Sequence, residues 1–260
     1  MVYPLRSTLR IQSELEANRP IPEPVARVVI AKPVKLYAET LVTVCREVFP
    51  AAQIHIYCRG LDVLGALRAQ PADLLVMSLA FPDIDGLDLL EPIAHEKLAA
   101  RVLVDSPRRD EYSLLMLRTA RFNGFVDTIS EGVEAMATAL LAVAAGQSYI
   151  SPTLRQNLVD RQPSTALGQR LTRAELHVLG VIGDGSDNEE AAPRLGLTPS
   201  TVQTHRRNIM RKLGVSTSAK LVREAVRLGV VRITPRGVML RWDAQAHRRA
   251  NPSPVPSLRT

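Results

Sequence analysis

The side chains best suited to recognition chemistry lie between positions 199 and 213. An apolar stripe has the spacing of one side of a helix and consists of Val202, His205, Ile209, Met210 and Leu213. The opposite side carries hydrogen-bonding and cationic side chains, namely Gln203, Thr204, Arg206, Arg207, Arg211 and Lys212. No Asp or Glu occurs from 198 to 223. A short helix with one buried face and one cationic, amide-bearing face suits the major groove of duplex DNA.

The formal charge of the chain is unevenly distributed. Residues 198–260 contain 13 Lys/Arg against 2 Asp/Glu, whereas residues 1–197 contain 20 against 24. This division is expected when only the C-terminal part contacts phosphates. A cationic helix face taken alone could equally be a solvated surface. The assignment to DNA therefore depends on the surrounding pattern.

Other kinds of chemistry find no support in the sequence. It contains no GxSxG, no HExxH, no phosphate-binding glycine loop and no Cys/His pair at a credible site, so we expect no enzyme activity, no metal and no cofactor. Cys45 and Cys58 fall in apolar patterns and are expected to be reduced core thiols. His205 is expected to be packed and hydrogen-bonded rather than a metal ligand. With no apolar span and no secretory signal, the predicted location is the cytoplasm and no membrane partner is expected.

Helical patterns separated by short breaks position the cationic face. Capping residues stand where helices should begin: Thr172 with Glu175 as a capping box, Asp187 or Ser186, and Thr198 followed by Pro199. Gly214 would close the third helix, and a fourth is predicted at 217–228. The sequence therefore predicts a compact helical domain in which the third helix carries the exposed cations.

Short apolar runs alternate with helical stretches in the N-terminal part. The runs, rich in Val, Leu and Ile, lie at 27–31, 53–58, 72–79, 101–105 and 124–127. The helical stretches lie at about 34–48, 60–69, 87–97, 109–121 and 131–145. Such alternation favours a parallel sheet covered by helices on both faces. We predict an α/β flavodoxin-like domain with a five-stranded parallel sheet.

These patterns divide the chain into five segments. A mobile arm at 1–25, with a short helix near 9–17, precedes the α/β domain at 26–146. A linker at 147–169 holds a short helix near 152–160. An all-α four-helix domain with a C-terminal β-hairpin, anchored by Trp242, occupies 170–243. The Pro-, Ser- and Arg-rich tail at 244–260 is expected to be disordered.

The segment 171–228 resembles the helix-turn-helix of the LuxR/NarL (GerE-type) family. The matching residues are Leu171, Thr172, Glu175, Val178, Leu179, Gly185, Asn188, Glu190, Ala192, Leu195, Gly196, Leu197, Thr201, Val202, Thr204, His205, Ile209, Lys212, Leu213, Gly214 and Val215. They match without gaps. A small residue at 192 lets two helices approach, and Gly196 supplies a left-handed turn before the recognition helix.

The resemblance implies which side chains would meet DNA. Base edges would be read by Gln203, Thr204 and Arg207, since Gln can pair with adenine and Arg with guanine. Phosphates would be met by hydroxyls at the helix N-terminus and by cations farther along, namely Ser200, Thr201, Arg206, Arg211 and Lys212. The family usually has Lys where this chain has Glu189, and often where it has Gln203, so operator affinity or sequence should differ. Pro193 inside the scaffold helix is expected to distort it locally without loss of the fold.

Residues 27–145 resemble the receiver domain of two-component response regulators. The resemblance is carried by ADLLVMSL followed by AFPDIDGLDLL, by RVLVDS and by FNGFV, and above all by the Pro82, Asp85, Gly86 and Leu87 loop. Asp83, Asp85 and Asp88 are expected at a solvated loop and helix N-terminus. Phe125 stands where the family keeps a switch aromatic, but a plain core or interface Phe is the simpler expectation.

The chemistry of a receiver is missing from the positions that should carry it. The family's paired acids align with Ile30 and Ala31, the phosphoacceptor with Ser78, and the Lys after the fifth strand with Thr128; only Ser106 matches. Mg²⁺ needs oxygen ligands, which Ile and Ala cannot supply. A neutral Ser cannot replace Asp as phosphoryl acceptor without an activating base. We therefore expect a degenerate receiver that is not phosphorylated on aspartate.

The leading hypothesis is an atypical response regulator that binds specific double-stranded DNA sequences and regulates transcription. The alternative is an adaptor or anti-activator that holds another regulator and binds DNA weakly. The resemblance also implies a homodimer, formed through receiver faces or through the apolar side of the fourth helix, Leu221, Val222, Ala225 and Val226. Further candidate partners are RNA polymerase and, at the receiver domain, a protein or small ligand.

Overall fold

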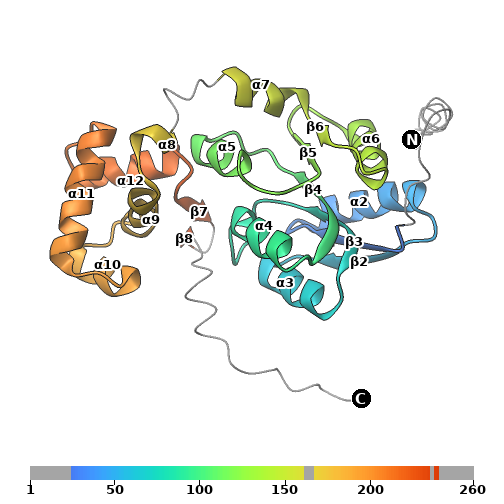
Figure 1. The fold of residues 1–260 in the computed structure, drawn as a ribbon, viewed down its shortest axis with the longest axis horizontal. Coiled ribbons are helices and arrows are strands. Elements are labelled where there is room, and N and C mark those ends of the chain that lie inside the picture. Colours follow the sequence, from blue (N-terminus) through green and yellow to red (C-terminus); the bar gives the residue numbers. More distant parts are fainter. Residues whose placement is uncertain (1–24, 161–166, 235–236, 240–260) are drawn as a thin grey trace, which may run out of the picture.

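The computed structural model describes residues 25–160, 167–234 and 237–239. An α/β part and a helical part lie side by side (Figure 1). The predicted N-terminal arm, the Trp242 anchor and the disordered tail lie outside the described residues.

One parallel sheet forms the centre of the α/β part. Its strands are β1 (Arg27–Ala31), β2 (Gln53–Tyr57), β3 (Ala72–Met77), β4 (Ala99–Asp105), β5 (Gly124–Val126) and β6 (Tyr149–Ile150). Their spatial order is β2-β1-β3-β4-β5-β6. The prediction of a doubly wound parallel sheet is confirmed, but five strands was one too few. The sixth pairs only Tyr149 and Ile150 with β5, which is too short to show a periodic pattern.

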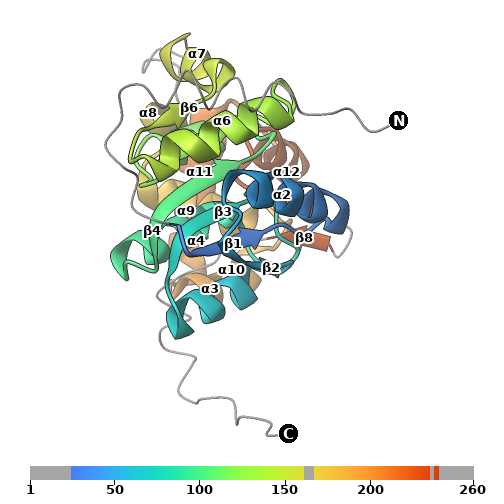
Figure 2. The ribbon, with the colours of Figure 1, turned by 90° about the vertical axis from the view of Figure 1, so that its right-hand side faces the viewer.

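Helices cover both faces of this sheet. They are α2 (Lys35–Val48), α3 (Gly60–Ala69), α4 (Gly86–His95), α5 (Glu111–Leu117) and α6 (Val133–Ala144). Alternate strand residues divide the buried side chains: Val28 and Ile30 of β1 join the cluster under α2 and α6, whereas Val29 and Ala31 join the cluster on the opposite face. Figure 2 shows α2 and α6 nearest the viewer, with the C-terminal helices behind.

The two cysteines differ, because Cys45 is buried in α2 while Cys58 is exposed. The expectation of a core thiol was therefore wrong for Cys58; burial raises the pKa of Cys45 to about 12.

The helical part follows α7 (Pro152–Asp160), which confirms the short helix expected near 152–160. Its helices are α8 (Leu167–Arg170), α9 (Arg173–Ile182), α10 (Asn188–Leu195), α11 (Pro199–Leu213) and α12 (Ser218–Arg227). The expected caps form: Thr172 and Glu175 make a capping box, and Asp187 caps α10. Gly196 and Gly214 adopt left-handed φ values of 65° and 69°, which end α10 and α11. α10 extends through Pro193, so the fold tolerates that residue as expected.

The expected C-terminal hairpin is present as β7 (Arg232–Thr234) and β8 (Gly237–Met239), which pair antiparallel. Just before it, the chain contacts the α/β part closely. The Tyr112 amide donates to the Leu228 carbonyl at 3.0 Å. Gly229 has a left-handed φ of 78°, and a Cβ at this position would collide with the Asp110 side chain, so the contact favours glycine.

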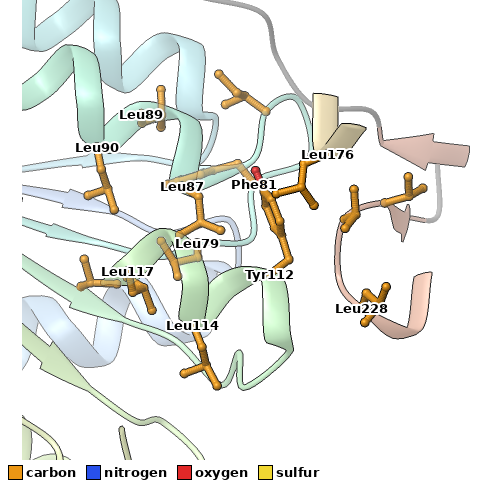
Figure 3. Packing of buried hydrophobic residues seen from close by; sticks show 14 of the residues in the cluster. Leu79, Phe81, Leu87, Leu89, Leu90, Tyr112, Leu114, Leu117, Leu176 and Leu228 are labelled. Atoms are coloured by element: carbon orange, nitrogen blue, oxygen red, sulfur yellow. The ribbon is translucent and has the colours of Figure 1, made fainter. Parts of the chain in front are cut away.

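A single apolar core connects the two parts. Figure 3 shows Phe81 and Tyr112 of the α/β part next to Leu176 of the helical part, with Leu114 and Leu228 on either side of them. All five are at least 95% buried and belong to one cluster. The helical part is therefore docked on the α/β part through burial of apolar surface, which stabilises this arrangement.

Candidate nucleic-acid interface

Helix α11 is built to present one face outward. Thr198 caps its N-terminus by accepting a hydrogen bond from the Thr201 amide, and Pro199 occupies the first turn, where a missing N–H costs nothing. Val202, Ile209 and Leu213 are buried against α9 and α10. These contacts fix the rotation of the helix, so the polar side must face away from the scaffold.

The three side chains expected to read bases are all exposed. Gln203, Thr204 and Arg207 lie on the open side of α11, and Figure 1 places this helix at the edge of the molecule farthest from the sheet. The α/β part therefore leaves this face uncovered. The Thr204 hydroxyl donates to the Ser200 carbonyl at 3.0 Å, which leaves its oxygen free to accept. His205 is half-buried between the two faces.

The side chains expected to meet phosphates fall into two groups. Ser200 is exposed at the N-terminus of α11 and Thr201 is half-buried beside it; each hydroxyl lies within 3.0 Å of the Thr198 hydroxyl. Arg211 is exposed, and its side chain forms no ion pair or hydrogen bond with the residues that the structure describes. These groups are available to an incoming phosphate.

Arg206 and Lys212 are already engaged inside the helical part. Arg206 donates to the Asn188 side chain at 2.9 Å and to the Ser186 carbonyl at 2.6 Å, and burial lowers its pKa. Lys212 lies 2.7 Å from the Glu175 carboxylate. Burial acts to raise the pKa of Glu175, but hydrogen bonds from Lys212 and Thr172 outweigh it and hold the pKa below its usual value. Both cations thus hold helices together, and a phosphate would have to compete for them.

At the carboxyl edge of the sheet, the positions aligned with receiver chemistry are packed rather than open. Ile30 and Ala31 are fully buried on opposite faces. Ser78 and Ser106 are buried, and their hydroxyls accept backbone hydrogen bonds from Ala80 and Arg108 in the following turns. Thr128 is exposed. These residues do not fit Mg²⁺, because they offer no free carboxylate.

A buried ion pair crosses this edge. The Lys32 ammonium, directly after β1, lies 2.6 Å from Asp105 at the end of β4, and their side chains are only 9% and 2% exposed. Burial raises the pKa of Asp105, with Lys32 opposing it. The second Asp105 oxygen has no hydrogen-bond partner among the described residues. Lys32 therefore places a positive charge directly after β1, at the edge of the sheet where the family has its paired acids.

The loop after β3 departs from the expectation of solvated acids. Asp85 is buried; it caps α4 through the Leu87 amide and accepts two 2.7 Å hydrogen bonds from Arg108. The Asp83 side chain is only 6% exposed and accepts from the backbone amides at the start of α3. That expectation was wrong for these two, because nearby cations and helix N-termini compensate their burial. Phe125 is buried in the core, as expected.

Sequence reasoning missed the charged residues at the strand ends. Asp105 and Asp127 follow buried strand residues, and each is paired, Asp105 with Lys32 and Asp127 with Arg109. An acidic residue at the end of each apolar run could have indicated that these side chains lie near one another, since parallel strands end at one edge of the sheet. The pairing itself depends on side-chain reach across the sheet, which strand patterns do not specify.

Comparison with known proteins gives matches over most of the chain. The family model described as "Bacterial regulatory proteins, luxR family" matches residues 169–225. The transcriptional regulatory protein UhpA of Escherichia coli is 32% identical over 165 residues, covering 63% of this chain and 79% of UhpA. The probable transcriptional regulatory protein SgaR of Hyphomicrobium methylovorum is 30% identical over 169 residues, covering 64% and 76%.

Solved structures show the same fold. RcsB from Salmonella enterica serovar Typhimurium, bound to promoter P1flhDC in the presence of phosphomimetic BeF3-, superposes with a TM-score of 0.53 at 18% identity. The match covers 77% of this chain and 97% of that one. At this identity the likeness supports the fold alone. Within the described ranges, no helix is both long and apolar enough to cross a membrane.

Proposed function

This chain belongs to the LuxR/NarL-type family of transcriptional response regulators, and from that premise we propose that it binds specific double-stranded DNA sequences as a homodimer without control by aspartyl phosphorylation. Residues 170–243 are the DNA-binding domain in this proposal. Residues 26–146 are a receiver-like domain, joined to it by 147–169. Contact with RNA polymerase and action in the cytoplasm remain predictions from the sequence.

The exposed face of α11 is the observation that carries DNA binding. Gln203 and Arg207 project outward while Val202 and Ile209 hold the helix on its scaffold. Arg207 forms no ion pair or hydrogen bond with the described residues, so its guanidinium is free to bond a guanine edge. In this proposal Arg211 is a better phosphate ligand than Arg206 or Lys212, because those two side chains would have to leave partners in the helical part.

Arg207→Ala is expected to weaken binding to the best operator by about 1–3 kcal/mol and to relax the base preference at one position. Arg211→Ala, the matched control on the same helix, should weaken binding equally on all sequences and lower the salt slope by about 1. Gel shifts on systematically varied operators over a range of salt concentrations measure both effects. Identical behaviour of the two variants would refute the base-reading role, and wild-type protein that failed to bind any genomic fragment would favour the adaptor alternative.

An exposed apolar patch supports dimer formation through the receiver-like domain. It lies at the N-termini of the neighbouring helices α2 and α6 and consists of Val34, Leu36, Tyr37, Ile129 and Val133. Leu36 and Ile129 are 69% and 66% exposed, so two large apolar side chains near these helix ends face solvent within one chain. The other candidate surface is less free, since Leu221 and Ala225 of α12 are fully buried within this chain. A protein that sedimented only as a monomer at DNA-binding concentrations would contradict the dimer.

The packed strand edge supports independence from phosphorylation. Ser78 is buried, and its hydroxyl already accepts a hydrogen bond from the Ala80 amide. Asp105, the carboxylate buried beside the aligned positions, is held by Lys32. We therefore expect neither a metal site nor an activated nucleophile there.

Incubation of the protein with acetyl phosphate and Mg²⁺ is expected to leave its mass unchanged, because no acceptor carboxylate faces a metal site. Intact mass spectrometry measures this directly, with a receiver that carries the full acidic set as the positive control. A stoichiometric single-phosphoryl adduct on this chain would overturn the proposal.

A further inference from the structure

A groove separates the two parts of the molecule beside their shared core. It has a volume of about 750 Å³ and lies between α4 and α5 on one side and α8 and α9 on the other. Its apolar lining comes from both parts: Leu115 and Met116 are half-buried, whereas the leucines that they accompany, Leu87, Leu90, Leu171 and Leu176, are buried. Figure 3 shows Leu87 and Leu90 on α4 across from Leu176. This volume lies within the range of sites that hold a small organic molecule.

The charged groups that line the groove are mostly basic. Arg121 follows α5, and Arg173 begins α9; both are exposed, and neither side chain pairs with any residue in the described ranges. His95 and His177 also line the groove, and Glu91 is the one acidic residue among the described residues that line it. Two unpaired guanidiniums beside an apolar surface favour a ligand that is anionic at one end.

We propose that this groove binds a small amphipathic carboxylate whose apolar body lies between the two parts of the protein and whose carboxylate meets Arg121 and Arg173. The leucine and methionine side chains supply the apolar contact, and the planar guanidiniums supply charge-assisted hydrogen bonds. The site is distinct from the packed strand edge at Ser78. It does not depend on the proposed DNA function.

Such a ligand would contact both parts of the molecule at once. Leu90 and Met116 belong to the receiver-like part, whereas Leu171 and Arg173 belong to the helical part. A molecule that binds only when both sets of contacts are present stabilises the docked arrangement by mass action. Binding is therefore expected to raise the thermal midpoint of the full-length protein.

A matched ligand series tests the chemistry on the unmodified full chain. 1-Naphthaleneacetate, its neutral amide and 2-(1-naphthyl)ethylamine share one aromatic body and differ in the charge of the end group. Isothermal titration calorimetry without DNA should give the carboxylate at least about tenfold tighter binding than the amide, and the ammonium the weakest binding, as expected for one charge-assisted contact. No binding by the carboxylate, or equal binding of all three compounds, would overturn the proposal.

Variants locate the site. Arg121→Glu combined with Arg173→Glu should abolish the preference for carboxylate over amide, whereas Arg155→Glu, an exposed cation on α7, should leave it unchanged. Ala94→Trp, which adds an indole to the lining without changing a charge, should reduce binding of both compounds. Unaltered carboxylate binding in both groove variants would place the ligand elsewhere and contradict the inference. Gel shifts run in parallel report DNA binding separately, so failure of either proposal is recognisable.

Discussion

Lys32→Met is expected to lower the free energy of unfolding by about 3–5 kcal/mol, the usual effect of removing one partner from a buried ion pair. The Lys32 and Asp105 charges lie 2.6 Å apart with both side chains at least nine-tenths buried. Without the ammonium, Asp105 keeps a buried carboxylate that has no other cation within ion-pair distance among the described residues. Urea unfolding followed by circular dichroism measures the loss.

The double variant Lys32→Met with Asp105→Leu tests whether the stability loss comes from the unpaired Asp105 charge. Replacement of both charges by apolar groups removes the desolvation cost together with the attraction, so the double variant is expected to be about as stable as the natural protein, or more so. Lys35→Met is the matched control, because this lysine is 87% exposed and its pairing with Glu39 should contribute less than about 1 kcal/mol. Losses that simply added in the double variant would show that the two residues act independently.

The ion-pair variants leave the phosphoacceptor position unchanged. Asp105 belongs to β4, whereas a receiver's phosphoacceptor aligns with Ser78, after β3. Removing the ion pair therefore frees no carboxylate at the acceptor position. Stability and phosphorylation can therefore be measured independently in the same variants.

Patterns along the chain were enough to place most elements. Strand β1 and helices α3 and α11 begin and end at the predicted residues, because apolar spacing and capping residues such as Thr198 act over a few positions. The open face of α11 follows from the same pattern, since burial of Val202 and Ile209 turns the cationic side outward. Local sequence thus determines both the helix and the face available to DNA.

Features that depend on distant contacts could not be predicted in this way. The partners of Asp85 are Arg108 and Arg232, which lie 23 and 147 positions away. Arg206 and Lys212 look like phosphate ligands in a helical pattern, yet their partners Asn188 and Glu175 come from other helices. A charge pattern shows that a side chain is cationic, but the tertiary structure decides whether it is free.

Asp85→Ala is expected to destabilise the protein by about 3–5 kcal/mol and to loosen the contact between its two parts. Asp85 is the common partner of Arg108, at 2.7 Å, and of Arg232 from the hairpin, at 3.6 Å, and it also caps α4. Its loss leaves the buried Arg108 with one remaining ion pair among the described residues, the longer contact to Asp110. Urea unfolding reports the stability, and small-angle X-ray scattering reports the separation of the two parts.

Arg232→Ala distinguishes the loosened contact between the two parts from the loss of stability. It removes the hydrogen bond to the Leu79 carbonyl and the contact with Asp85, but leaves Asp85 paired with Arg108. We expect the radius of gyration to increase as with Asp85→Ala, with a smaller stability loss of about 1–3 kcal/mol. Asp62→Ala, an exposed acid in the first turn of α3, should change neither quantity measurably. If Arg232→Ala left the scattering profile unchanged, the apolar contacts of Tyr112 and Leu228 alone would hold the two parts together, and the Asp85 cluster would serve only the fold of the receiver-like part.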